Sequence, residues 1–309
     1  MKLLYIIIIT FLLSASGLYA ETNIYHRTDF DRGEVVTVLI TETEKSYSLE
    51  LFNSSNQYIT QNIFFPVNID NFQGQAALIG LDSTLSSGEY TLRVKNQDGV
   101  TVEEGAIFIH QNLFKKENIS LNYDNTSLRT DTDPEISRQA AAIHEIYETS
   151  DNKSVFSSNS FVSPLQDGII TSWYGDRRNF IYSDGKNSKS IHSGIDIAAP
   201  VGTEICAGSE GRIVLSSSRI ITGNSIVIEY LPGVYGVFFH MDKIYVLPGD
   251  KVSKDTVIGT LGATGLATGP HLHWEFRVGG VPVNPEACLE NGLIDNSLIM
   301  SIVSSYTAE

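Results

Sequence analysis

Short runs of apolar residues, separated by turn-forming residues, fill positions 21–118. In Tyr90, Leu92 and Val94 the apolar side chains recur at every second position, which is the period of a strand with one buried face. Strands are expected at 35–40, 47–52, 63–69, 90–95 and 106–110. Short strands at this spacing predict an N-terminal domain that is a small β-sandwich, of the immunoglobulin-like kind.

The pattern changes to a helical period within residues 119–160, which we interpret as a connector. Its apolar residues recur at intervals of three and four and so share one face of a helix: Ile136, Ala140, Ile143 and Tyr147. Asp133 is expected to cap this helix, with Pro134 at its first position and Glu135 near the positive end of its dipole. The helix is expected to continue to about Glu148.

Residues 161–290 return to short β runs that alternate with Gly and Pro turns. Strands are expected at 211–215, 225–230, 234–240, 257–261 and 271–278. This pattern predicts a second, compact and mostly β domain, so the fold class is mainly β with a short helical connector. Residues 291–309 are expected to form a C-terminal tail without a clear role.

Residues 1–20 have the pattern of a secretory signal peptide. A basic start at Met1-Lys2 precedes an apolar stretch over 3–13 and a small-residue exit that ends at Ala20. Cleavage is expected after Ala20, with export to the periplasm or cell envelope. The alternative is an uncleaved anchor, but the apolar stretch is shorter than the ~20 residues that a bilayer span needs. No later segment is long and apolar enough to span a membrane.

Composition narrows the function classes. The chain of 309 residues suggests about two domains, and its 42% hydrophobic content argues against disorder. The net charge of −15 argues against a nucleic-acid partner, because such proteins need a basic face to displace counterions from phosphate. The two cysteines, Cys206 and Cys288, are too few for a disulfide scaffold, and their spacing does not decide whether they pair.

Candidate chemistry gathers in the second domain, which holds His192, His240, His271 and His273. In the segment HLHWEF, the strand period of two places His271, His273 and Glu275 on one face, against an apolar opposite face. Two imidazoles on a rigid strand make a metal-binding or proton-transfer pair. The alternative is an ordinary half-exposed strand, with Glu275 as a surface acid rather than a partner that steadies a ligand.

His192 and Asp196 add an imidazole and a carboxylate four residues apart, with Gly194 permitting a bend between them. Alone this spacing is a weak signal. Together with the histidine strand, it offers three nitrogen and oxygen ligands of the kind zinc accepts, and catalytic zinc sites leave a fourth position open. His240 follows an apolar strand whose alternation places it with Gly236 and Phe238, and it is a candidate to support the transition state.

These segments resemble the lysostaphin/LytM-type zinc endopeptidases of bacterial cell walls over about residues 161–287. The resemblance rests on three motifs in the family's order. An H-x(3)-D motif opens HSGIDIAAPVGTEICAGSEGRI, an aromatic segment with a histidine lies in GVYGVFFHMDKIYVLPGDKV, and an H-x-H motif preceded by TGP lies in IGTLGATGLATGPHLHWEFRVGGVPVNP. The chain departs from the family at Met241, Cys206 and the turn 229–232, and none of these changes removes a ligand.

The resemblance implies a groove-bearing β domain that holds one zinc ion on His192, Asp196 and His273. It implies that His271 is the general base, or orients the attacking water, and that His240 stabilises the tetrahedral oxyanion. Upstream, the family's domain entrance is similar to SPLQDGIITSWYGDRR. There Arg177 and Arg178 either pair with a carboxylate of a stem peptide or form an exposed, solvated pair.

The expected function is therefore an exported zinc endopeptidase that hydrolyses peptide cross-links of bacterial peptidoglycan. One alternative is a non-catalytic module on the same fold that binds the wall or activates a hydrolase, and another is a structural protein with incidental histidines. A further hypothesis is that the N-terminal domain or the connector covers the groove. The sequence does not decide between a D-Ala–diamino-acid bond and a glycine bridge as the scissile link, nor the oligomeric state.

Overall fold

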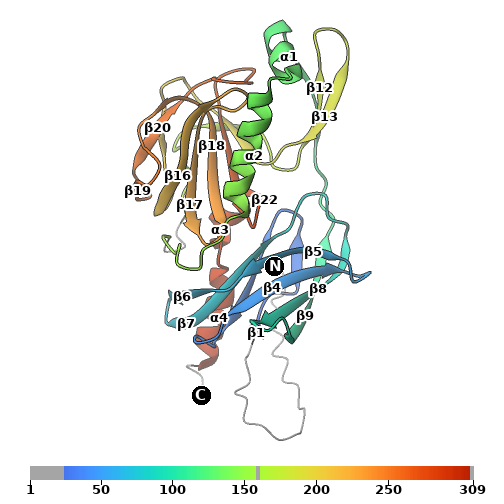
Figure 1. Ribbon diagram of the computed structural model, residues 1–309, viewed down its shortest axis with the longest axis vertical. Helices are drawn as coiled ribbons and strands as arrows, with labels where there is room; N and C mark the ends of the chain where they lie inside the picture. The colour runs from blue at the N-terminus through green and yellow to red at the C-terminus, as the bar shows by residue number, and fades with distance from the viewer. Residues whose placement is uncertain (1–23, 158–160, 307–309) are drawn as a thin grey trace, which may run out of the picture.

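The structure of the protein is a computed structural model that describes residues 24–157 and 161–306 (Figure 1). The expected signal peptide, residues 1–20, lies outside the described residues, so its cleavage stays a prediction. Among the described helices none is both long and apolar enough to cross a membrane. Both cysteine thiols are free, with Cys206 partly exposed and Cys288 buried.

The N-terminal part of the described chain consists of two facing sheets. One has the order β1 (Ile24–Tyr25), β3 (Val35–Ile40), β7 (Phe72–Gly80), β6 (Phe65–Ile69). The other has the order β2 (Asp29–Asp31), β9 (Thr101–His110), β8 (Gly88–Asn96), β4 (Tyr47–Asn53), β5 (Tyr58–Ile63). Side chains from both sheets share one core, including Val38 of β3, Leu51 of β4 and Leu92 of β8. The predicted β-sandwich is confirmed.

Strand β7 has no counterpart among the predicted strands. Its residues do not alternate in polarity because the strand is buried on both faces. Ala77 and Ile79 lie in the core of the sandwich, whereas Ala76 and Leu78 lie in a second core that continues into the other half of the molecule. A strand that packs into two cores has a continuous apolar sequence, so a search for alternating residues does not find it.

The connector contains β10 (Lys116–Ser120), α1 (Tyr123–Thr130) and α2 (Pro134–Glu148). Helix α2 is confirmed: the Asp133 carboxylate accepts a hydrogen bond of 2.8 Å from the Glu135 N–H, as expected of a cap. Neither β10 nor α1 was predicted. Strand β10 pairs in parallel with β12 (Arg177–Ile181), which also pairs with β13 (Asn187–Ile191), so the connector completes a sheet of the second domain.

The second domain is built on a large sheet. Along the described chain its order is β11 (Ile169–Ser172), β14 (Ile195–Ala198), β21 (Leu272–Val278), β18 (Val234–Ile244), β17 (Gly223–Leu231), β16 (Gly211–Arg219), β19 (Lys251–Val252). Shorter strands join its edges: β20 (Val257–Leu261) on β18, β15 (Glu204–Cys206) on β20, and β22 (Val281–Val283) on β21. The predicted strands of this domain are confirmed, and most extend further than expected.

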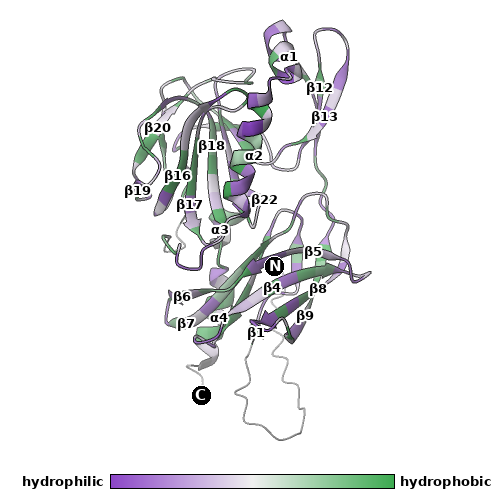
Figure 2. Cartoon of the chain, in the orientation of Figure 1, coloured by the Kyte–Doolittle hydropathy of each residue, from purple (hydrophilic) through white to green (hydrophobic). Residues whose placement is uncertain are grey.

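The two faces of this sheet have different partners. Phe238, Trp274 and Phe276 point into the extended core shared with the N-terminal half. On the opposite face, Val237 and Phe239 pack against the buried face of α2. Figure 1 shows α2 running alongside β18 next to strands β16 and β17, and Figure 2 shows hydrophobic residues along these strands. The connector therefore covers one face of the sheet that carries the histidine strand.

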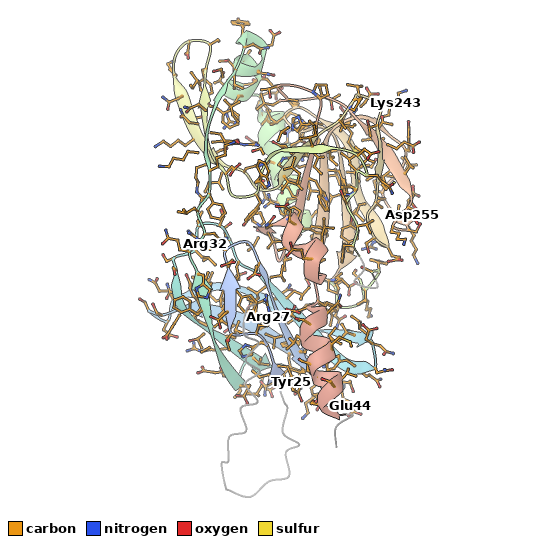
Figure 3. All side chains as sticks on the ribbon, turned by 180° about the vertical axis from the view of Figure 1, so that it is seen from behind. Tyr25, Arg27, Arg32, Glu44, Lys243 and Asp255 are labelled. Atoms are coloured by element: carbon orange, nitrogen blue, oxygen red, sulfur yellow. The ribbon has the colours of Figure 1, made fainter. Side chains whose placement is uncertain are left out.

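The C-terminal segment also differs from the prediction. Residues 291–309 were expected to be a tail without a role, yet α4 (Asn296–Tyr306), which follows α3 (Pro285–Asn291), is a helix that packs on the N-terminal half. Asp295 precedes α4 and accepts hydrogen bonds from the N–H groups of Ser297 and Leu298, a capping signal that the sequence analysis overlooked. Asp295 also pairs with Arg27 at 2.8 Å, and Figure 3 shows Arg27 beside this helix.

One apolar core thus joins both halves of the molecule. It contains Leu39 and Leu78 from the N-terminal sheet, Trp274 from the second domain, and Leu298 and Ile299 from α4. The domain boundaries stay a prediction. The apolar core, however, is continuous between the two halves. The two β units are expected to unfold together.

Leu298→Ala is expected to lower the free energy of unfolding of the whole chain by about 2–5 kcal/mol, because it leaves a cavity in the shared core. Met300 lies two residues further on α4 and is 57% exposed, so Met300→Ala is the matched control and is expected to change the free energy by about 0.5 kcal/mol or less. Urea denaturation followed by tryptophan fluorescence measures both. Equal effects of the two substitutions would contradict the shared core.

Candidate metal centre

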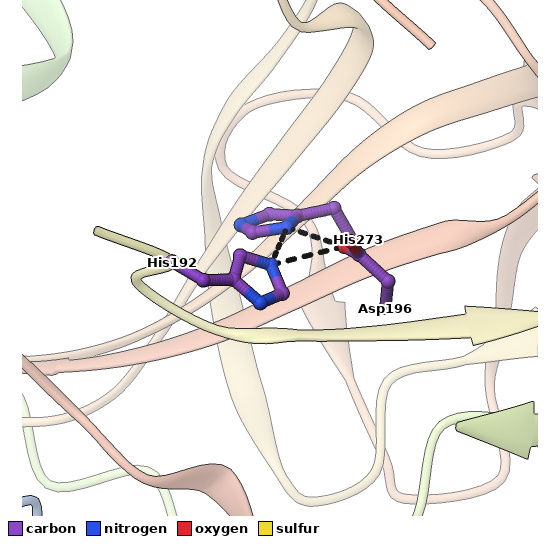
Figure 4. Close-up of side chains that lie close together, drawn as sticks. All are labelled: His192, Asp196 and His273. Carbon is purple, nitrogen blue, oxygen red and sulfur yellow. Dashed lines mark hydrogen bonds and ion pairs between the residues drawn. The ribbon is translucent and has the colours of Figure 1, made fainter. Parts of the chain in front are cut away.

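Three ligand atoms from two neighbouring strands and the turn before one of them meet at a point. Asp196 on β14 is paired directly with His273 on β21, and His192 lies just before β14. His273 Nδ1 lies 2.8 Å from Asp196 Oδ1, and His192 Nε2 lies 3.1 Å from the same oxygen (Figure 4). The two ring nitrogens are 3.0 Å apart. Within the described residues, this group alone brings three ligand atoms of His, Cys, Asp or Glu within 4.8 Å of one another.

Gly194 is needed between His192 and Asp196 because the chain passes close to β21 there, and not because it bends. Its φ is not in the left-handed region. Instead, a Cβ at this position would fall on the carbonyl oxygen of Trp274 in β21. The glycine therefore allows the chain to pass close against β21 and brings His192 beside His273.

In each of the four imidazoles, the ring nitrogen that faces away from the group already has a hydrogen-bond partner in the protein. In three of the histidines Nδ1 lies near a backbone carbonyl oxygen: His192 with Trp173 at 2.9 Å, His240 with Thr264 at 2.8 Å and His271 with Gly269 at 2.8 Å. Because a carbonyl only accepts, Nδ1 carries the hydrogen and Nε2 keeps its lone pair. His273 has the opposite arrangement, since its Nε2 donates to Glu275 at 2.9 Å and leaves Nδ1 free toward Asp196.

Glu275 holds His273 in this orientation. Its side chain is buried, and Oε2 accepts a hydrogen bond of 2.8 Å from Arg277 Nε, while Oε1 also accepts one from Ser193. Burial by itself raises the pKa of Glu275, but Arg277 and His273 outweigh it and hold the pKa far below its usual range. The sequence left Glu275 open as a surface acid. The structure instead has a buried anion behind the His273 ring.

The electrostatics of the trio favour a cation. Burial alone lowers the pKa of His273, yet the hydrogen bonds and charges of Asp196 and Glu275 prevail and raise it to about 9. Burial opposes ionisation of Asp196, but its close interactions with the His192 and His273 rings keep its pKa well below the usual value. Two carboxylates thus flank one imidazole in a buried setting, which stabilises positive charge at the centre of the group.

His240 reaches the group through an unusual backbone conformation. Strand alternation predicted that it would lie on the face of Phe238, and this is wrong. His240 has φ 62°, in the left-handed region, within a strand whose pairing shifts on either side of it. The distortion turns its ring toward His271 at 4.8 Å and toward His273 at 6.3 Å, measured between ring centroids. Such a conformation costs about 1–3 kcal/mol in a non-glycine residue and is typical of functional sites.

His271, the remaining predicted site residue, also lies close to His192, Asp196 and His273. His271 precedes β21, and its Nε2 lies 3.7 Å from Asp196 Oδ1.

Burial lowers the pKa of His240, and the neighbouring His271 and His273 lower it further, to about 3. His240 is therefore neutral near pH 7.

The two arginines of the entrance segment are both engaged within the protein. Arg178, with a side chain only 14% exposed, forms an ion pair with Asp196 Oδ2 and lies 3.6 Å from Glu117 of β10. Arg177 donates to the carbonyl oxygen of Ser83 in the N-terminal half at 2.7 Å. Neither belongs to an exposed, solvated pair. Arg178 binds the outer oxygen of Asp196, a contact that no motif in the sequence indicated.

The part of the chain that contains this site matches a known family. Residues 190–285 match the family described as Peptidase family M23, and this span contains all five residues discussed above as ligands or neighbouring histidines. DD-carboxypeptidase/endopeptidase Mpg of Neisseria meningitidis serogroup B is 37% identical over 124 residues, which is 40% of this chain and 28% of Mpg. Peptidoglycan DD-endopeptidase ShyC of Vibrio cholerae is 42% identical over 94 residues, which is 30% of this chain and 22% of ShyC.

The aligned region thus spans less than a third of the length of these curated relatives. A crystal structure from Pseudomonas aeruginosa, described as a peptidase M23, covers 84% of this chain and 93% of its own, with a TM-score of 0.60. Its sequence identity is 23%, so it shows a common fold over both halves of the molecule. The matched span contains the ligand geometry described above, so residues 190–285 are similar to peptidase family M23 in sequence and in the placement of these side chains.

Proposed function

We propose that the chain is a zinc-dependent endopeptidase that hydrolyses peptide cross-links of bacterial peptidoglycan. The observation that carries the proposal is the convergence of His192 Nε2, Asp196 Oδ1 and His273 Nδ1. Two imidazoles and one carboxylate suit zinc, and a three-ligand site leaves room for a reacting group. The names of both relatives include an endopeptidase activity. Mpg is named a DD-carboxypeptidase/endopeptidase, and ShyC is named a peptidoglycan DD-endopeptidase. We therefore assign the D-Ala–diamino-acid link, rather than a glycine bridge, as the scissile bond.

The residues around the trio fit a metal ion. Each proposed ligand has a partner on its outer atom: the Trp173 carbonyl for His192, Arg178 for Asp196 and Glu275 for His273. Such partners orient ligands and tune their basicity, and they accompany most histidine ligands of metals. The raised pKa of His273 indicates that positive charge is favoured at this position, which a divalent ion would supply.

Zinc at this position would supply Lewis-acid chemistry, since it lowers the pKa of water to about 7 and polarises a carbonyl oxygen. We assign proton acceptance from the attacking water to His271, whose Nε2 faces the trio while its Nδ1–H is held by Gly269. The proton would then be passed to the leaving amine, as required for cleavage of an amide.

His240 stabilises the oxyanion in this proposal. Its Nδ1–H is bound to Thr264, so a hydrogen bond to the oxyanion requires a proton on Nε2. His240 is neutral at rest, so this second proton has to come from solvent water, and the negative charge that develops beside the ring favours its uptake only as the reaction proceeds. The predicted export to the cell envelope would bring the enzyme to its cell-wall substrate.

Metal removal and ligand substitution are expected to abolish hydrolysis. Treatment with a zinc chelator, or His273→Ala, should eliminate muropeptide release from purified peptidoglycan, measured by mass spectrometry of the soluble products. His110→Ala is the matched control, because His110 lies in the N-terminal half and is exposed. Retention of full hydrolytic activity by His273→Ala would refute the assignment.

Glu275→Gln is expected to weaken zinc binding by about 10–100-fold, because the amide no longer places a negative charge behind His273. Glu204→Gln, at an exposed acid on β15, is the control and should leave the affinity unchanged. Competition with a chromophoric chelator measures both affinities. If the two substitutions have the same effect, Glu275 does not support the ligand.

His271→Ala and His240→Ala are expected to retain about one zinc per chain and to lower kcat by about 10²–10⁴-fold, since neither residue is a proposed ligand. Metal content by atomic absorption and kcat on a soluble cross-linked muropeptide separate these two effects. Loss of the metal from either variant would instead make that histidine a ligand.

A further inference from the structure

A cavity lies between the connector helix α2 and the large sheet, with a volume of about 230 Å³. Ile136 and Ile143 of α2 form one side, and Phe239, Thr222, Arg219 and Arg277 contribute the other. A water molecule needs only about 10–15 Å³ measured in this way, so the space accommodates a group of the size of an amino-acid side chain.

The cavity adjoins the metal centre. The Phe239 ring, which forms part of the cavity wall, is stacked on the imidazole of His273, with centroids 5.6 Å apart and an angle of 9° between the planes. Thr222, another lining residue, accepts a hydrogen bond of 2.9 Å from the backbone N–H of His240. A peptide whose scissile bond lies at the metal centre could therefore place a neighbouring group in this cavity.

The charge lining the cavity is positive. Arg219 and Arg277 both line it, and no Asp or Glu belongs to the described lining. The Arg277 guanidinium is already engaged, since it binds Glu275 and the carbonyl oxygen of Gly280 and lies over the Tyr147 ring. Its charge is thus largely offset within the protein.

Arg219 differs because it keeps an unused donor. Its Nη2 donates to the carbonyl oxygen of Gln139 on α2 at 2.7 Å, but its buried Nη1 has no hydrogen-bond partner among the described residues. Burial also lowers the pKa of Arg219, which reflects the unfavourable setting of a charge with little compensation. Buried polar groups without partners are rare in folded proteins and call for an explanation such as an absent ligand.

We propose that this cavity is a subsite that binds a free carboxylate of the peptide substrate through Arg219 Nη1. The proposal rests on the proposed function, since stem peptides of peptidoglycan carry free carboxylates. A carboxylate would satisfy the orphan donor with a charge-assisted hydrogen bond, and the apolar side chains of Ile136 and Ile143 would exclude water around it. The connector helix is then part of the substrate-binding surface.

The test compares binding of a stem tetrapeptide with binding of forms in which one carboxylate at a time is converted to the amide. Calorimetry on the chelator-treated full-length mature protein avoids both cleavage and coordination of the carboxylate to zinc. For one carboxylate position, the acid is expected to bind about ten-fold more tightly than the amide. Arg219→Gln should reduce this ratio to about one by weakening the acid alone, and Arg219→Lys should restore part of it.

Arg138→Gln is the matched control, because Arg138 lies on α2 with a side chain 74% exposed and pairs with Glu135 outside the cavity. This variant should keep the wild-type ratio. Equal binding of acid and amide at every position, or equal weakening of both by Arg219→Gln, would overturn the subsite. Hydrolysis of intact peptidoglycan by the zinc-loaded wild type reports separately on the proposed function, so the two can fail independently.

Discussion

The pairing of β14 with β21 is the constraint on which the site depends. In this antiparallel pair Asp196 lies opposite His273, between Ile195 opposite Trp274 and Ile197 opposite Leu272. The apolar neighbours are anchored in the shared core, so the alternate residues must face the other way, toward the candidate metal centre. Because a strand has a period of two, a slip by one residue would turn the ligands into the apolar core and the core residues toward the ligand position. Core packing and ligand placement are therefore fixed by the same register.

The segments outside these two strands refine that arrangement. The turn before β14 brings His192 close because Gly194 permits contact with the β21 backbone, and Arg178 from β12 steadies Asp196 from behind. Strand β10 of the connector pairs with β12 and contributes Glu117 beside Arg178. The connector therefore supports the centre from one side through β10 and covers the adjoining sheet face through α2. The hypothesis that the N-terminal domain or the connector covers the groove stays a prediction.

Sequence reasoning succeeded where the physical signal is local. Alternation located β8 and β21, and the Asp133-Pro134 start located α2 to the residue. It failed for β7, which two cores bury on both faces, and for α4, whose partner lies more than 200 residues away in the chain. In the site, motif spacing brought out the five residues that the structure gathers. The ion pair of Arg178 and the turned ring of His240 depend on tertiary contacts and backbone distortion, which no spacing encodes.

The left-handed backbone of His240 has a consequence for how this position tolerates change. Glycine or asparagine would adopt that geometry with less steric conflict, so either exchange relaxes the main chain while discarding the imidazole. Under the proposed function, selection for stability and selection for turnover therefore act in opposite directions at a single residue. A lineage released from the need to cleave its substrate would be expected to lose this ring early, well before the apolar scaffold beneath it begins to drift.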